Sequence, residues 1–121
     1  MGKKLRLSLI LLGCLCLGVC QQLRAADYYW IGGSGNWSDI NNWATTSGGA
    51  TIHVVVPALG DNVIFDANSF SAPGQVVNVD VGNASCHDMV WTGAGFNPTI
   101  TGTNLRIAGS LTLIPNMTFD I

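Results

Sequence analysis

Short runs of alternating apolar and polar residues recur along the second half of the chain, separated by glycine, asparagine and proline. The clearest run spans 75–81 (QVVNVDV), in which three valines would face one side of a strand while Asn78 and Asp80 face the other. The chain after position 27 lacks glutamate and lysine and is rich in threonine, valine, asparagine and glycine, so it is predicted to be all-β. The other predicted strands are Thr51–Val56, Asn62–Phe65, Met89–Trp91, Thr99–Thr101, Leu105–Ile107, Leu111–Leu113 and Met117–Phe119.

Some of these strands recur at a spacing close to the roughly 20-residue period of a β-solenoid coil. Three pairs, with offsets of 26, 22 and 17 residues, are Val79 with Leu105, Met89 with Leu111, and Ile100 with Met117. We therefore predict that residues 51–121 form the first coils of a β-solenoid, with a small β-sandwich as the alternative. Because the strand pattern runs to the last residue without a polar cap, we expect the chain to be the N-terminal piece of a longer protein.

Residues 27–50 contain an unusual concentration of tryptophan. Trp30, Trp37 and Trp43 lie within fourteen residues, among glycines and small polar residues that disfavour a helix. The segment predicts a short strand, a glycine-rich turn and a loop anchored by aromatic rings, which together would cap the β-domain. Two roles remain open for the three rings: they pack inward as a structural cap, or they are exposed as a carbohydrate-binding platform.

The N-terminus has the layout of a secretory signal peptide, predicted to span residues 1–26. A basic start precedes an apolar run over 7–20, which is short for a membrane span, and small residues follow at Ala25 and Ala26. Cleavage after either alanine would release a secreted or cell-surface chain with no stable membrane insertion. The alternatives are lipoprotein processing at Cys14, where LLGC resembles a lipobox, and a retained N-terminal anchor.

Charge is distributed unevenly, and this excludes some functions. From position 27 onward one arginine, Arg106, stands against seven aspartates, which gives a formal net charge of −6. Nucleic acid is therefore not an expected partner, because neutralising phosphates requires several basic side chains. Cys14, Cys16 and Cys20 belong to the apolar run, so Cys86 is left without an intramolecular partner and is predicted to be a small buried apolar residue.

The remaining polar residues form no recognisable catalytic or metal-binding constellation. His53 and His87 lack the further ligands of a metal site or the third member of a Cys-His catalytic group, so both are expected in solvent-facing turns. Asp61 and Asp66 could offer oxygen ligands to calcium, but capping of turns explains them better. We predict no catalytic residues, no metal and no cofactor.

Two motifs carry a family resemblance. The segment WIGGSGNWSDINNW (30–43), followed by Pro57 and DNVIFD (61–66), resembles a pattern at the start of very large bacterial surface proteins. These are similar to autotransporter passenger domains and adhesin-like repeat proteins, and GSLTL (109–113) also looks like one of their rungs. The resemblance implies a right-handed parallel β-helix, export to the cell surface or outer membrane, and adhesion or display.

The function predicted from the sequence is therefore that of an exported, adhesin-like structural module without catalytic activity of its own. Its possible partners are surface glycans or ligands on host or neighbouring cells. One alternative is a carbohydrate-binding module that uses exposed Trp30, Trp37 and Trp43. The other is the N-terminal fragment of a polysaccharide-acting β-helix enzyme whose catalytic rungs would lie elsewhere.

Overall fold

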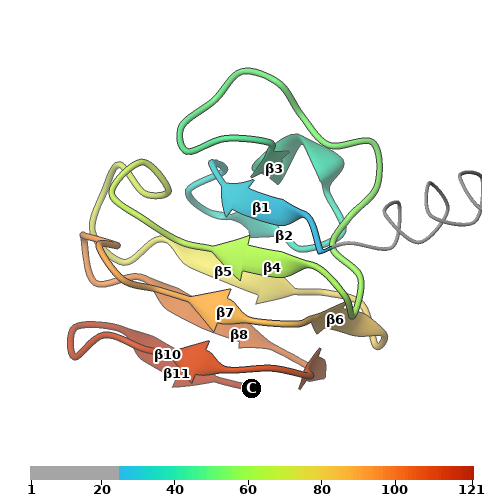
Figure 1. Cartoon of the computed structure of the whole chain (residues 1–121). Coiled ribbons are helices and arrows are strands. Elements are labelled where there is room, and N and C mark those ends of the chain that lie inside the picture. The colour runs from blue at the N-terminus through green and yellow to red at the C-terminus, as the bar shows by residue number, and fades with distance from the viewer. Residues whose placement is uncertain (1–24) are drawn as a thin grey trace, which may run out of the picture.

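The computed structural model describes residues 25–121, which form an all-β domain (Figure 1). The predicted signal segment lies almost entirely outside these residues, as do Cys14, Cys16 and Cys20. Within residues 25–121, no helix has the length and apolar character needed to cross a membrane. The elements are β1 (Asp27–Trp30), β2 (Gly35–Asn36), the 3₁₀ turn η1 (Ile40–Asn42), β3 (Trp43–Ala44), β4 (Asn62–Ile64), β5 (Val76–Val79), β6 (Ala84–Cys86), β7 (Met89–Val90), β8 (Thr99–Gly102), β9 (Leu105–Ile107), β10 (Leu111–Thr112) and β11 (Thr118–Asp120).

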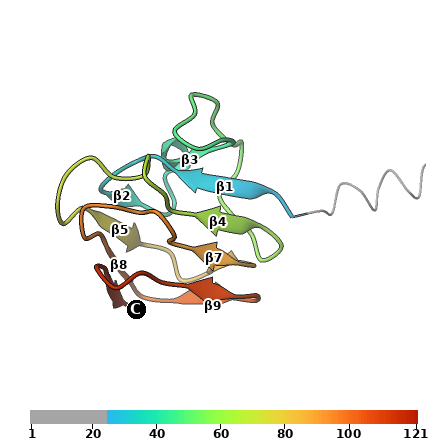
Figure 2. The same cartoon turned by 60° about the vertical axis from the view of Figure 1, so that its left-hand side comes forward.

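The strands form three small sheets, which the chain visits in turn. The first sheet has the order β10-β7-β4-β1-β3, the second β11-β8-β5-β2, and the third consists of β6 and β9. From β4 onward the chain passes from the first sheet to the second and then to the third, and repeats this circuit. Within each sheet, a strand pairs in parallel with the strand that the next circuit adds to the same sheet. The exception is β3, which pairs antiparallel with β1. Figures 1 and 2 both show β1, β4 and β7 stacked in succession.

Parallel register stacks apolar side chains from successive circuits inside the domain. In the first sheet Val63 pairs with Met89, and in the second Val77 pairs with Ile100. All four side chains are fully buried. The alternation in β5 confirms the predicted strand: Val77 and Val79 are buried whereas Asp80, just beyond the strand, is exposed.

The predicted pairing between circuits was correct in one case out of three. Met89 does pair with Leu111, at the expected offset. Ile100 pairs with Phe119 rather than with Met117, because β11 begins only at Thr118. The turn before β11 is therefore longer than the apolar pattern indicated.

The third predicted pair was wrong for a different reason. Val79 pairs with Gly102 in the second sheet, and Leu105 pairs with Ala84 in the third sheet. Strand β6 was not predicted, because Ala-Ser-Cys is short and contains none of the β-branched or aromatic residues that mark strands. Without β6, Leu105 was paired with Val79 instead of Ala84.

The predicted strand Thr51–Val56 was also wrong. Only Ile52 makes a β-bridge, an isolated antiparallel one to Ala44, and the side chains of Val54 and Val55 are 93% and 62% exposed. Strand β3, the edge strand that Ile52 contacts, is only two residues long, so most of this β-branched segment has no ladder to join. Propensity alone does not form a strand without a partner.

Candidate functional site

The three clustered tryptophans pack against one another at the β3 end of the domain. Trp30 ends β1, Trp37 follows β2 and Trp43 lies in β3. The ring centroids of Trp30 and Trp43 are 5.0 Å apart at an interplanar angle of 81°, and those of Trp37 and Trp43 are 4.9 Å apart at 72°. These are edge-to-face arrangements, in which the positive edge of one ring meets the negative face of the other.

A second group of rings extends this aromatic cluster toward the next circuits. Phe65 stacks on Trp91 with centroids 3.8 Å apart and nearly parallel planes, and Phe70 lies parallel to both. Trp30 connects the two groups, because its ring centroid is 6.0 Å from that of Phe65. The aromatic cluster, defined as Tyr28, Trp30, Trp37, Trp43, Phe65, Phe70 and Trp91, belongs to the hydrophobic core of the described chain.

The burial of Trp30, Trp37 and Trp43 bears on the two roles left open for them. Each is 0% exposed. The indole N–H of Trp30 donates to the carbonyl of Gly33 at 2.9 Å, and that of Trp43 donates to the carbonyl of Trp37 at 3.0 Å. A sugar ring stacks on an accessible aromatic face, which none of the three offers, so this structure does not support a carbohydrate platform at these positions. All three rings pack inward, into the hydrophobic core.

The glycines of this segment make room for one buried polar side chain. A Cβ at Gly32 would lie 2.1 Å from Oδ1 of Asn42, and a Cβ at Gly35 would lie 2.5 Å from its Nδ2. Asn42 is 8% exposed and donates through Nδ2 to the carbonyl of Asn36 at 3.0 Å. The glycine-rich turn therefore accommodates a structural amide that ties β2 to the 3₁₀ turn, a role that sequence reasoning missed.

The histidines and the cysteine do not form a reactive group. His53 stacks on Tyr28, with ring centroids 3.6 Å apart. His87 is exposed, and its Nδ1 lies 3.0 Å from Oδ1 of Asp88. Cys86 is fully buried, as predicted. Burial, with a smaller contribution from Asp88, raises the pKa of the Cys86 thiol to about 12. A thiol held protonated at neutral pH is a poor nucleophile.

The aspartates proposed as turn caps do cap turns. The carboxylate of Asp61 accepts hydrogen bonds from the backbone N–H groups of Ala26 and Ala58, at 3.1 and 2.9 Å. Asp66 accepts one from the backbone N–H of Asn68 at 3.0 Å. Within residues 25–121, no three His, Cys, Asp or Glu side chains come together as a metal-binding group would require.

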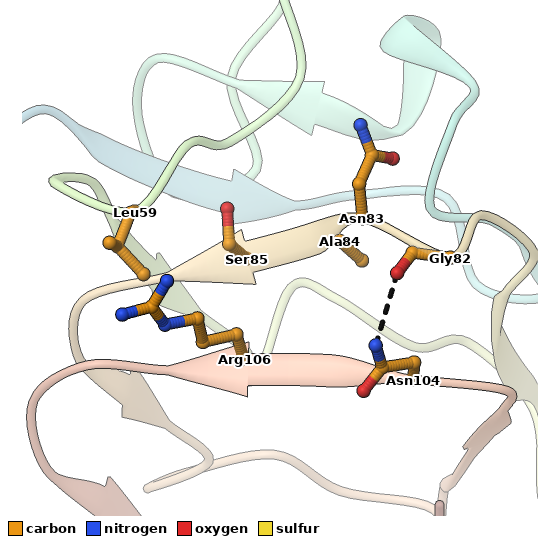
Figure 3. Close-up of a pocket in the computed structure, with 7 residues that line it drawn as sticks. All are labelled: Leu59, Gly82, Asn83, Ala84, Ser85, Asn104 and Arg106. Atoms are coloured by element: carbon orange, nitrogen blue, oxygen red, sulfur yellow. Dashed lines mark hydrogen bonds between the residues drawn. The ribbon is translucent and has the colours of Figure 1, made fainter.

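A shallow groove of about 250 Å³ lies on the outer face of the third sheet (Figure 3). Its lining residues are Leu59, Gly82, Asn83, Ala84, Ser85, Asn104 and Arg106. The side chain of Arg106 extends along the face toward Leu59. Among the residues drawn, one hydrogen bond is present, from Nδ2 of Asn104 to the carbonyl of Gly82 at 3.1 Å. The other polar side chains of the groove are therefore not hydrogen-bonded to one another.

Sequence reasoning did not identify this groove. Its only signal was that Arg106 stands alone as a cation among aspartates, and a single charge does not define a site without knowledge of its neighbours. Searches against protein-family models, curated proteins and solved structures found no match to this chain. The resemblance to bacterial surface proteins thus stays a prediction.

Proposed function

We propose that this chain is an exported, non-catalytic structural module of a cell-surface protein, built as the opening coils of a right-handed parallel β-helix. The observation that carries the architecture is the repeated circuit through three sheets, with parallel pairing between successive circuits. The proposal of export is supported by the basic start and apolar run of the N-terminal sequence. A β-sandwich, the alternative, is built from antiparallel sheets. The right hand follows from the general preference of parallel crossovers.

The β3 end of the domain supports the role of an N-terminal cap. Strand β3 pairs antiparallel with β1, which ends the stack of parallel strands in the first sheet. The aromatic cluster fills the interior beneath it, and the segment that follows β3 folds over this end in Figure 1. A stack of coils needs such a cover, because its cross-section is apolar.

The opposite end supports the stacking of further β-structure. Strands β9, β10 and β11 have no partner on their outer side within residues 25–121. Leu111, Leu113, Phe119 and Ile121 lie in this region, each 38% to 44% exposed. Unpaired backbone groups beside apolar side chains form a template for another strand layer. Further coils would bury this surface and lengthen the module into a stiff stalk for display or adhesion.

Cell fractionation tests export. The full chain, expressed with a C-terminal epitope tag in a Gram-negative host, is expected outside the cytoplasm with a mature N-terminus at Ala26 or Asp27. As a matched control, Leu11→Asp with Leu12→Asp interrupts the apolar run and should retain the precursor in the cytoplasm. Cytoplasmic accumulation of an unprocessed chain beginning at Met1, with the wild-type leader, would overturn the proposal.

Disulfide trapping tests the architecture. Thr101 of β8 is in register with Asp120 of β11, and Thr118 is two residues out of register with it. Adjacent parallel strands lie about 4.8 Å apart, within the range that a disulfide spans. The pair Thr101→Cys with Asp120→Cys should cross-link readily, and the control pair Thr101→Cys with Thr118→Cys should cross-link slowly. Equal rates, or preference for the control pair, would exclude the stacked coils.

A further inference from the structure

The groove on the third sheet is built from the outward positions of two neighbouring strands. In β6 Ala84 and Cys86 are 5% and 0% exposed, so they point inward. The positions next to them, Asn83 and Ser85, therefore face outward, because side chains alternate along a strand. Arg106, between two partly buried residues of β9, faces outward in the same way.

Register places these outward side chains side by side on adjacent circuits. Ser85 is the direct partner of Arg106 in the parallel ladder. Asn83 and Asn104 each lie one residue before the paired residues Ala84 and Leu105, so these two residues are also neighbours. Two amides, a hydroxyl and a guanidinium thus line one groove, with Leu59 at one side.

Arg106 is the one lysine or arginine within residues 25–121, and it carries no salt bridge there. The carboxylate of Asp61, two residues beyond Leu59, is engaged by backbone N–H groups. That of Asp80, two residues before Gly82, accepts hydrogen bonds from Ser38. The guanidinium therefore keeps its donors available within an otherwise acidic surface.

We propose that this groove binds the carboxylate of an acidic sugar such as a uronic acid. The planar guanidinium of Arg106 matches a carboxylate with two parallel N–H donors. Asn83, Ser85 and the free oxygen of Asn104 supply neutral donors and acceptors of the kind that sugar hydroxyls need. One charged group among several neutral polar groups suits one carboxylate on a hydroxylated ligand better than a strongly acidic peptide.

This site is distinct from the aromatic cluster, and the inference does not rest on the proposed structural function. Because the groove is open and the net charge from position 27 onward is −6, binding should be weak and salt-sensitive. The probe is a trigalacturonate, titrated into the full purified chain while the Nε–H signal of the Arg106 side chain is followed by NMR. The variant Arg106→Gln assigns this signal by its loss.

The expected result is a saturable shift of the Arg106 signal by trigalacturonate and no shift by its methyl-esterified form. Arg106→Gln should weaken binding about fivefold or more, followed through the backbone signals of β6, and Arg106→Lys should recover only part of the loss. The control Arg106→Gln with Thr92→Arg restores the net charge at an exposed turn after β7, at the opposite end of that strand from β6, and should not restore binding.

Three outcomes would overturn the proposal. The first is the absence of any shift at low ionic strength, and the second is equal binding of the methyl-esterified probe. The third is recovery of affinity by Thr92→Arg, which would show attraction to net charge rather than a built site. Tighter binding of an aspartate-rich peptide than of trigalacturonate would also reject a sugar as the ligand, and would assign the groove to a protein partner.

Discussion

Gly102 is the position at which the stacked register is most sensitive to a single methyl group. Its φ is +147°, a conformation that L side chains rarely adopt, and it pairs directly with Val79 of the preceding circuit. A Cβ on Gly102 would lie 2.3 Å from the carbonyl oxygen of Val79 and 2.5 Å from its Cβ. Because the nearest atom belongs to the backbone of a buried strand, the clash cannot be relieved by rotating a side chain.

The cost of Gly102→Ala combines two contributions. An unfavourable φ costs about 1–3 kcal/mol, and the clash with the backbone of Val79 costs about 1–3 kcal/mol more, as overpacking does. The loss of freedom in the unfolded chain returns about 0.4–1 kcal/mol. The free energy of unfolding should therefore fall by about 1–5.6 kcal/mol, a large part of the stability of a small domain.

Alanine substitutions at two other glycines separate the cost of the φ angle from the cost of the clash. Gly74 has a φ of +70° but no atom within 4 Å of the position of its Cβ, so Gly74→Ala carries the φ cost without the clash. Gly60 has neither an unusual positive φ nor a nearby atom, so Gly60→Ala should be neutral or slightly stabilising. From the most to the least stable variant, the expected order is Gly60→Ala, then Gly74→Ala, then Gly102→Ala.

Urea unfolding followed by tryptophan fluorescence measures this series, because all four tryptophans are fully buried and should shift to the red on unfolding. The native chain should emit in the blue and resist iodide quenching. Two results would contradict this account of Gly102. One is a free energy of unfolding for Gly102→Ala within about 1 kcal/mol of the wild-type value, and the other is a loss for Gly74→Ala as large as that for Gly102→Ala.

Three further predictions concern buried and charged groups. Trp43→Phe deletes an indole donor and leaves the buried carbonyl of Trp37 unpaired, whereas the indole N–H of Trp91 has no partner within residues 25–121. Trp43→Phe should therefore destabilise by about 1–3 kcal/mol more than Trp91→Phe in urea unfolding, and equal losses would contradict this. Alkylation at pH 8, located by peptide mass spectrometry, should reach Cys86 only when the chain unfolds, and rapid labelling of the native chain would be inconsistent with its raised pKa. The pKa of Asp80 is lowered, mainly by the hydrogen bond from the Ser38 hydroxyl. The resulting stabilisation is present above the ordinary carboxyl pKa and is lost as pH falls through the lowered pKa. In urea unfolding at a series of pH values, Asp80→Asn should therefore remove a small part of the acid dependence of the free energy of unfolding, under about 1 kcal/mol because the pair is exposed.

Local alternation was enough to predict most strands, and local composition was enough to predict that the tryptophan segment is not helical. Asn62–Ile64, Val76–Val79 and Leu105–Ile107 lie where the apolar pattern placed strands. The pattern predicted a strand at Thr51–Val56, where only an isolated bridge forms, and it missed the strand at Ala84–Cys86. A strand needs hydrogen-bonding partners, and whether an edge is free to supply them depends on the rest of the chain.

By itself, the sequence determined the all-β class, the burial of Cys86 and the turn-capping aspartates, because each follows from the chemistry of a residue and its immediate neighbours. The tertiary structure alone decided that Trp30, Trp37 and Trp43 face inward, and that Ser85 lies beside Arg106. Period-two alternation says that a strand has two faces, but the core side and the neighbouring strand depend on contacts between residues far apart in the chain.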